Sequence, residues 1–486
     1  MARPIVLIHG YSADSHDFSA FSKGLQARNI NAKDINICDY VSLSNEVTVK
    51  DIAEGLDRAL LNQAGLKNGE TFDAIVHSTG MLVIRCWLTA YGQEVDRERI
   101  KRLKHLVGVA PATWGSPQAH KGRTFLGALV KGNRNLGPDF MEAGDRILDA
   151  LELGSRFTWD LAHADLLGAK PSFDTGANTP WVAVYIGDQP YDGVPSVAND
   201  PGTDGTVRWA GCGLNTRKIT ADLTKEKQEE RFSFSDWAIS KKVTRQDVPI
   251  MPVPGKNHGT IVQEPDKAMM DHIVKFLQLD TQAAFDVWQQ EWPTETFDKI
   301  KKARTGDSGN LAAKLLSLIK PAASAQIDGW QQFIVYAKDE RGDSIRDYMI
   351  EVEASDDGNK WHLMDQMYQN VHPYKGDPGL RCFHIRLGQG LSARNFQIRV
   401  KITADTGTEM VGYLGFDSQS DQARTMGRSD MIRKDGPRPF VLEFNNQLPT
   451  GGTFFFPFTT TLVEIKLNRE PLLNSKPPIV SLNSIS

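Results

Sequence analysis

The sequence has few cysteines and no long apolar run. Its 486 residues include only Cys38, Cys86, Cys212 and Cys382, which lie far apart and form no C-x-x-C pair. This spacing argues against a zinc module and against a disulfide-dense secreted scaffold. Because no run of 18 or more apolar residues occurs, we expect no integral membrane segment.

A concentration of one charge is also absent. The 56 Lys and Arg residues and the 60 Asp and Glu residues give a net charge of −4, and the basic residues are spread along the chain. Because nucleic-acid binding needs a basic patch, we expect no nucleic-acid partner. The sequence also lacks the G-x-x-x-x-G-K-[ST] and H-E-x-x-H motifs and a G-x-G-x-x-G after its first strand. We therefore expect neither a metal nor a cofactor.

The chain reaches the apolar stretch PIVLIHG after three residues. No signal peptide fits into so short a leader, so we expect a cytoplasmic protein or the trimmed form of a secreted one. The length and the hydrophobic content of 40% are enough to bury at least one large core. They predict a globular protein of about two to four domains.

Short apolar runs alternate with helix-patterned segments from residue 4 to about residue 280. This alternation is typical of βαβ units around a parallel sheet. Strands are predicted at 4–10, 32–40, 72–78, 105–111, 181–188 and 248–255, and helices at 16–28, 49–65, 79–92 and 263–278. We expect residues 1–280 to form one domain, a mostly parallel sheet with helices on both faces.

Three segments depart from this pattern. Residues from about 118 to 168 form a Gly-interrupted helical insert that is too long for a simple connection. Residues 281–325 are polar and predict a helical bridging segment. Residues 326–486 consist of short strands separated by turn signals, which predicts an accessory domain built as an antiparallel β-sandwich.

Ser78 lies where the predicted strand 72–78 meets the following helix. A nucleophilic serine at such a turn needs small neighbours two residues away on either side. The stretch Val76-His77-Ser78-Thr79-Gly80 satisfies this at Gly80 but not at Val76, whose branched side chain crowds the turn. Two interpretations therefore stand: a nucleophile held on a strained turn, or an ordinary serine that ends a strand.

A nucleophilic serine also needs an oxyanion hole made by two backbone N–H groups. One comes from the residue after the nucleophile, and the other from a loop after an early strand. His9 and Gly10 end the first predicted strand. The N–H groups of Tyr11 and Thr79 are therefore the candidate donors.

These stretches, LIHGY and VHSTG together with NHG at residues 257–259, resemble the α/β-hydrolase fold, and within it the lipase and esterase families. The resemblance covers residues 4 to about 278. It implies a serine hydrolase that cleaves carboxylic esters through a Ser-His-Asp triad and an acyl-enzyme, without a cofactor. The substrate would be a small-molecule or lipid ester.

The family order of the triad is Ser, then Asp or Glu, then His. The resemblance implies His258 as the base, because it follows the last predicted strand and precedes the final helix. His272 lies inside that helix, where a surface or packing role is expected. In the family the residue at the position of His77 points away from the chemistry.

The acid is less defined by the sequence. The loop GDQPYDGVPSVANDPGTDGTV offers Asp188, Asp192, Asp200 and Asp204. Asp204 is the best match, because Asp-Gly-Thr-Val resembles the loop in which many lipases carry their acid. Asp188, which directly ends a strand, is the alternative family position. A solvated loop in which none of the four acts is the third interpretation.

In the resembled lipases a cap covers the acyl pocket where this chain has its insert. Six apolar residues are candidates to line a slot for an acyl chain: Trp114, Phe125, Leu126, Leu129, Phe157 and Trp159. Packing between cap helices is the competing use for most of them. The sequence does not separate an esterase from a lipase or a phospholipase.

Four phenylalanines surround Pro457 in the stretch TFFFPF of the predicted β-sandwich. An exposed aromatic loop would give this domain a contact with a lipid surface. A buried edge strand with a bulge at Pro457 is the competing interpretation, and we favour it. For the whole chain, the alternatives to an esterase are a non-catalytic scaffold with a hydrolase fold and a phospholipase or acyltransferase with the same triad.

Overall fold

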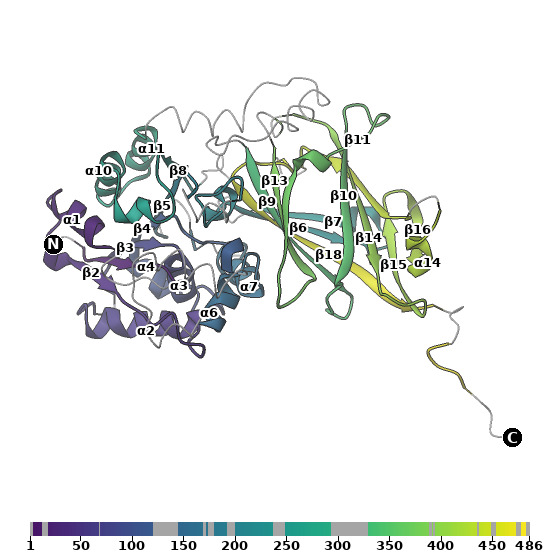
Figure 1. Cartoon of the computed structure of the whole chain (residues 1–486), viewed down its shortest axis with the longest axis horizontal. Coiled ribbons are helices and arrows are strands. Elements are labelled where there is room, and N and C mark those ends of the chain that lie inside the picture. The colour runs from purple at the N-terminus through teal and green to yellow at the C-terminus, as the bar shows by residue number, and fades with distance from the viewer. Residues whose placement is uncertain are drawn as a thin grey trace.

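The chain folds into two parts that lie side by side (Figure 1). The computed structural model describes residues 3–11, 18–67, 69–119, 144–168, 172–173, 179–191, 200–236, 248–292, 329–387, 391, 394–434, 437–448, 453–472 and 478–482. No helix among them is long and apolar enough to cross a membrane. The predicted bridging segment lies mostly outside these residues.

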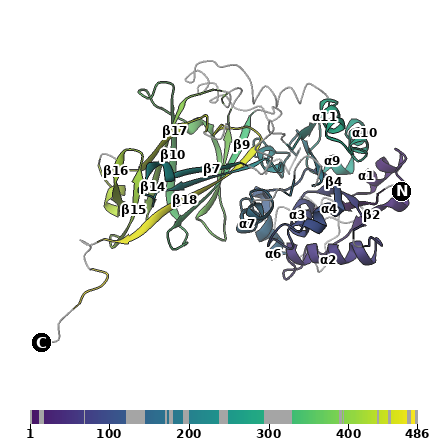
Figure 2. The same ribbon diagram turned by 180° about the vertical axis from the view of Figure 1, so that it is seen from behind.

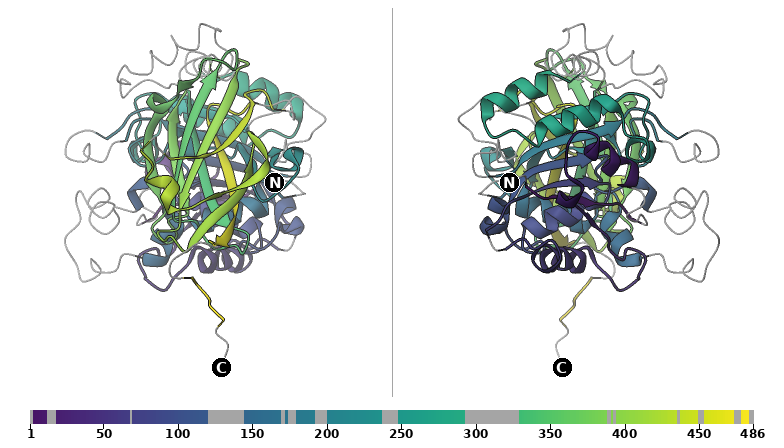
Figure 3. Two further views of the ribbon diagram at one scale, coloured as in Figure 1. Left: turned by 90° about the vertical axis from the view of Figure 1, so that its right-hand side faces the viewer. Right: turned by 90° about the vertical axis from the view of Figure 1, so that its left-hand side faces the viewer.

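The first part is a parallel sheet between helices. Its described strands are β1 (Ile5–Ile8), β2 (Ile35–Cys38), β3 (Phe72–His77), β4 (Leu103–Val109), β5 (Trp181–Gly187) and β8 (Ile250–Val253), in the order β2-β1-β3-β4-β5-β8. The helices are α1 (Ser19–Gln26), α2 (Val49–Asn62), α3 (Gly80–Leu88), α4 (Arg97–Arg102), α6 (Asp145–Leu151), α7 (Arg156–Asp165), α8 (Trp209–Cys212), α9 (Thr260–Gln263), α10 (Lys267–Phe276) and α11 (Gln282–Gln290). They cover both faces of the sheet (Figure 3), which confirms the predicted architecture.

Both faces of this sheet are apolar because successive side chains of a strand point to opposite sides. In β1, Ile5 and Leu7 join the core that also holds α1 and α10, whereas Val6 and Ile8 join the core that holds α2 and α3. A buried parallel strand therefore reads as a continuous apolar run, which is how the sequence revealed it.

The second part is a β-sandwich, as predicted, but it is not purely antiparallel, because two of its central strands, residues 330–339 and 459–471, pair in parallel. Its strands are β9 (Trp330–Asp339), β10 (Asp347–Ser355), β11 (His362–Leu363), β12 (Tyr368–Pro373), β13 (Leu380–Arg386), β14 (Gln397–Asp405), β15 (Val411–Asp417), β16 (Ser420–Met426), β17 (Phe440–Asn445) and β18 (Thr459–Pro471), with the short helix α14 (Arg428–Met431). One sheet has the order β11-β10-β14-β17, and the other has the order β12-β13-β9-β18-β15-β16. We call the latter the junction sheet.

Two strands from the first part of the sequence belong to the junction sheet. β6 (Thr216–Asp222) pairs in parallel with β18, and β7 (Phe232–Asp236) pairs with β6. Figure 1 and Figure 2 show these blue to teal strands among green and yellow ones. The predicted domain range 1–280 therefore contributes to both parts of the fold, and the boundary at residue 280 stays a prediction.

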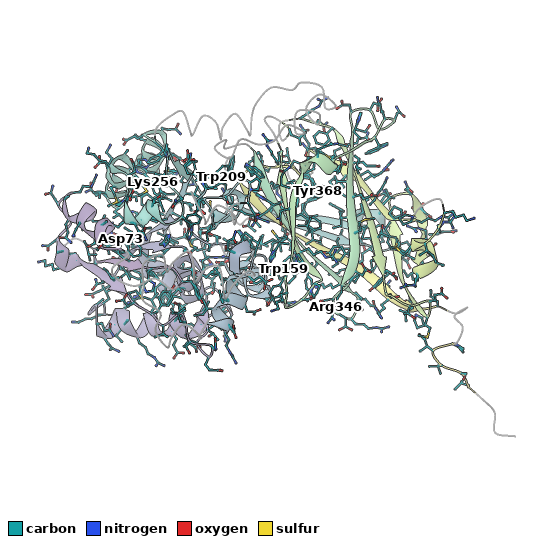
Figure 4. All side chains as sticks on the ribbon, in the orientation of Figure 1. Asp73, Trp159, Trp209, Lys256, Arg346 and Tyr368 are labelled. Atoms are coloured by element: carbon teal, nitrogen blue, oxygen red, sulfur yellow. The ribbon has the colours of Figure 1, made fainter. Side chains whose placement is uncertain are left out.

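The junction sheet is buried on both faces along β9. Phe333 and Val335 point into the interior of the sandwich, whereas Ile334 and Tyr336 join the same core as α2 and α3. Trp159 of α7 packs edge to face against Tyr336, with ring centroids 5.6 Å apart. Trp159 lies where the two parts meet in Figure 4. The two parts thus share one continuous apolar core.

The aromatic run around Pro457 is mostly buried. Phe454, Phe455 and Phe458 are at most 7% exposed, and Phe454 stacks on Phe333 at a centroid distance of 5.1 Å. The interpretation of these three residues as an exposed lipid-facing loop is wrong, because Phe454 and Phe455 fill the interior of the sandwich and Phe458 joins the core shared with α2 and α3. The favoured interpretation, a buried edge strand with a bulge at Pro457, is right about the burial but wrong about the strand, because these residues form bends and a turn that precede β18.

Glu464 of β18 accepts from Lys218 and Lys338 of the neighbouring strands, each at 2.6 Å. Burial alone would raise the pKa of Glu464, but the two ammonium groups lower it to about 2. A carboxyl whose pKa is lowered by folding stabilises the fold above its unfolded pKa and loses this effect as the pH falls towards its folded pKa.

We therefore expect Glu464→Gln to lower the melting temperature at pH 7, and the difference from the wild type to shrink as the pH falls from about 4.5 towards 2. Thermal unfolding of both proteins across this range measures it. Glu470→Gln on the exposed end of the same strand is the control and should show no such trend. A difference that stays constant with pH would contradict the prediction.

Candidate active site

Ser78 occupies a strained turn between β3 and α3. Its φ is +51°, in the left-handed region that non-glycine residues rarely adopt, and such strain clusters at functional sites. The turn also requires close approach of the backbone: a Cβ on Gly80 would lie 2.6 Å from the carbonyl oxygen of Ile8, and one on Gly10 would lie 2.8 Å from Ser78 Cβ. These features favour the nucleophile over an ordinary turn serine.

Val76, which departs from the motif, is fully buried in the core. It pairs with Gly108 of β4, and side chains of paired residues in a parallel sheet share a face. Gly108 leaves room there, which Met81 fills, since a Cβ on Gly108 would lie 2.9 Å from Met81 Cε. Val76 is therefore a core residue of β3, and Ser78 adopts the strained turn although Val76 departs from the motif.

His258 is hydrogen-bonded to Asp204. His258 Nδ1 lies 2.9 Å from Asp204 Oδ2, and the His258 backbone N–H donates to the Asp204 carbonyl oxygen at 3.0 Å. Asp204 is fully buried, and its Oδ1 accepts from the backbone N–H groups of Thr206 (2.9 Å) and Val207 (2.7 Å). Because a carboxylate accepts from Nδ1–H, the Nε2 atom of a neutral His258 is left to accept a proton.

The other candidate acids take other roles. Asp188 Oδ1 accepts from the backbone N–H of Gly255 at 2.7 Å and so holds the turn after β8. The carbonyl of Asp200 accepts from Thr203 Oγ1 at 2.8 Å. Asp192 lies outside the described residues. Among the candidates that the structure describes, Asp204 is the one hydrogen-bonded to His258.

The loop that carries Tyr11 is anchored by its neighbour His9. Tyr40 stacks on the His9 ring at a centroid distance of 4.4 Å, and its hydroxyl donates to the His9 carbonyl oxygen at 2.9 Å. Thr79 follows Ser78 at the N-terminus of α3. Tyr11 lines the same cavity as Ser78 and His258. The predicted oxyanion donors must face this cavity, because the ester carbonyl would bind there.

His77 does not point away from the chemistry, contrary to the expectation. Its Nε2 lies 3.0 Å from the carbonyl oxygen of His258, and the two rings are 4.8 Å apart. Burial lowers the pKa of His77 to about 3, so the ring is neutral at ordinary pH. Because a carbonyl only accepts, His77 donates through Nε2–H and tethers the loop of His258 to the turn of Ser78. Its place beside the serine was the only signal in the sequence.

We expect His77→Leu to lower kcat for ester hydrolysis about 10-fold with little change in KM, because the loop of His258 loses its tether. His77→Gln should retain most of the activity, since its amide can donate from nearly the same position as Nε2–H. Steady-state kinetics of the purified variants measure this. Equal activities of the Leu and Gln variants would contradict the tether.

A cavity of about 320 Å³ opens beside these residues. Its described lining consists of His9, Gly10, Tyr11, Phe18, His77, Ser78, Ser116, Leu151, Tyr191, Thr206, Asn257, His258, Gly259, Thr260, Val262 and Gln263. Its volume lies in the range of small-molecule sites. Within the part of the chain that the structure describes, no group of three or more His, Cys, Asp or Glu residues could hold a metal ion.

The predicted substrate-binding residues do not line this cavity where they are described. Trp114 and Trp159 are buried in the core, and Phe157 packs against it. The helix α7, which carries Phe157 and Trp159, packs on α3. Phe125, Leu126 and Leu129 lie outside the described residues. The sequence missed Leu151, Thr206 and Val262, which sit on segments that only the fold brings together.

No family model matches the chain, and no curated protein matches it. Phospholipase PlaB from Legionella pneumophila is a similar solved structure, with a TM-score of 0.69, 20% identity and coverage of 99% of this chain and 98% of that one. PlaB in complex with thio-NAD gives a TM-score of 0.69 at 21% identity, with the same coverage. The mature lipase BlEst2 from Bacillus licheniformis gives a TM-score of 0.35 at 11% identity over 57% of this chain and 93% of that one. The chain has the α/β-hydrolase fold joined to a β-sandwich, and the similarity to PlaB covers both parts.

Proposed function

We propose that this protein is a serine hydrolase that cleaves carboxylic esters, with Ser78 as nucleophile, His258 as base and Asp204 as acid. The observation that carries the proposal is the meeting of a strained serine and a carboxylate-bound histidine on one cavity. This arrangement is the one that activates a serine in acyl transfer.

In the proposed reaction, His258 Nε2 takes the proton of Ser78 Oγ as the oxygen attacks the ester carbonyl. Asp204 stabilises the imidazolium that forms. The N–H groups of Tyr11 and Thr79 hold the oxyanion, and the alcohol leaves with the proton from His258. Water, activated in turn by His258, then splits the acyl-enzyme.

The cavity lining supports an ester with both apolar and polar parts. Phe18, Leu151 and Val262 form apolar walls, whereas Ser116 and Thr206 bring hydroxyl groups. An apolar acyl group and a polar alcohol group would each find a matching wall. Phospholipid esters combine the two, and the similar PlaB is named a phospholipase. Within the ester class, we therefore propose a phospholipid or lysophospholipid as the substrate.

A substrate series tests the class. We expect hydrolysis of p-nitrophenyl esters, and faster acyl release from phospholipid vesicles than from emulsified triglyceride at equal acyl concentration. If the protein hydrolysed p-nitrophenyl esters but neither phospholipid nor triglyceride, it would be an esterase rather than a phospholipase or a lipase. A preference for alcohol over water as the acyl acceptor, measured with added glycerol, would instead indicate the acyltransferase. A protein that neither hydrolyses esters nor reacts with a fluorophosphonate probe would be the non-catalytic scaffold.

A further inference from the structure

Asp204 lies in a small hairpin between β5 and β6. Residues 203 and 208 form a β-bridge, and the backbone N–H of Trp209 donates to the carbonyl oxygen of Gly202 at 2.9 Å. We call residues 202–209 the acid hairpin. Any movement of its closing residues displaces Asp204, because Asp204 Oδ1 accepts N–H bonds from residues of the same hairpin.

The junction sheet packs directly against the acid hairpin. Gly202 lies on the ring of Trp330 so closely that a Cβ there would be 2.6 Å from it. Just beyond the hairpin, Thr460 Oγ1 of β18 donates to the Ala210 carbonyl oxygen at 3.2 Å. Figure 4 shows Trp209 where the two parts of the molecule meet. The hairpin that carries the proposed acid therefore packs against β9 and β18, which come from the C-terminal part of the chain.

Arg208 of the acid hairpin makes the polar contacts between this hairpin and the junction sheet. Its side chain is fully buried, and its Nη1 and Nη2 atoms donate to Cys382 Sγ of β13 (3.4 Å) and Asn370 Oδ1 of β12 (3.1 Å). Neither partner is a carboxylate, and Nε has no hydrogen-bond partner among the described residues. Burial lowers the pKa of Arg208, although the charge of the nearby Asp200 opposes this effect. Because no hydrogen bond joins Asp200 to the guanidinium among the described residues, a direct ion pair does not explain this arginine.

We propose that Arg208 is a positioning residue, whose guanidinium fixes the acid hairpin to β12 and β13 and so holds Asp204 against His258. The inference rests on the proposed function. A planar guanidinium reaches two acceptors on neighbouring strands at once, which neither an apolar side chain nor the single ammonium of lysine does in the same geometry. Strands β12 and β13 then position Asp204 through Arg208, rather than belonging to an independent module.

Kinetics of five variants test the proposal: Arg208→Met, Arg208→Lys, Asn370→Ala, the Arg208→Met/Asn370→Ala double variant and, as a matched control, Arg231→Met. Arg231 is also a buried arginine bonded to uncharged acceptors, with Nε donating to the Lys225 carbonyl at 2.9 Å, but it lies within the sandwich. We expect Arg208→Met to lower kcat about 10- to 100-fold with KM within about twofold, since small misplacements of catalytic groups cost rates of this size.

Arg208→Lys should recover part of the loss, and Asn370→Ala should lower kcat in the same direction by less. The Arg208→Met/Asn370→Ala double variant should be no slower than Arg208→Met alone, because both changes remove one tether. Arg231→Met should lower the melting temperature but keep kcat. If Arg208→Met does not fold, Asn370→Ala decides the question, because Asn370 lies outside the cavity lining.

Wild-type kcat in both Arg208→Met and Asn370→Ala would overturn the inference and leave the proposed function intact. A fall in kcat for Arg231→Met as large as that for Arg208→Met would also overturn it, since a general loss of stability would then explain both. Failure of the proposed function looks different. The wild type would then turn over esters no faster than Ser78→Ala, and the role of Arg208 would fall with it.

Discussion

Ser78→Ala is expected to remove ester hydrolysis, lowering kcat by about 10⁴-fold or more, while the melting temperature stays close to that of the wild type. The reason is that Ser78 Oγ is the proposed attacking atom, and no other group of the cavity replaces it. Alanine adds no atoms to the tight turn in which Gly10 and Gly80 crowd Ser78. Rates on p-nitrophenyl esters and a thermal unfolding curve measure both effects.

A fluorophosphonate probe with peptide mass spectrometry gives an independent readout. It should label the wild type at Ser78 and leave Ser78→Ala unmodified. Ser355→Ala, which changes another buried serine far along the chain in β10, is the matched control and should keep both rate and labelling. Near-normal turnover by Ser78→Ala would dismiss the proposed nucleophile.

The central part of this site could be predicted because its signals are local. A buried strand has a continuous apolar run, and the turn of Ser78 needs small residues at fixed offsets. The short stretches LIHGY and VHSTG were therefore enough to locate the turn and the predicted oxyanion loop. The environment of Val76, which departs from the small-residue motif, is seen only in the structure. Its neighbour Gly108 lies on the next strand, and the sequence does not say which glycine faces which side chain.

Long-range pairing was beyond the sequence. β6 pairs with β18, from the opposite end of the chain, so residues 216–236 could not be assigned to the second part from local pattern. Packing against β12 and β13 buries Arg208, although its place in the sequence is that of an ordinary loop arginine near Asp204. His77 was misjudged for a related reason, because its partner is a backbone carbonyl and backbone groups leave no trace in a sequence.

Trp114 and Trp159 illustrate a third kind of error. Large apolar residues near an insert suit an acyl pocket and a core equally well, since both exclude water. The fold decides between them, and it places both tryptophans in the core that joins the two parts. The cavity instead takes its apolar surface from other residues, Phe18, Leu151 and Val262.

Asp204→Asn is expected to lower kcat by about 10⁴-fold, which would separate Asp204 from the alternative acid Asp188. Asp204 Oδ1 accepts two backbone N–H bonds, so the oxygen of an asparagine must stay on that side. Its NH2 group then faces His258 Nδ1, which becomes an acceptor. The proton moves to Nε2, and the base can no longer take a proton from Ser78.

Asp188→Asn is the matched control. Asp188 Oδ1 accepts one backbone N–H, from Gly255, and an amide oxygen can do the same, so kcat should stay within a few-fold of the wild type. Measuring both variants on one soluble ester at pH 7, with melting temperatures alongside, distinguishes a change of tautomer from a loss of folding. A larger loss of kcat in Asp188→Asn than in Asp204→Asn would make Asp188 the acid. The contacts between the junction sheet and the acid hairpin would then no longer be explained by the positioning of the acid.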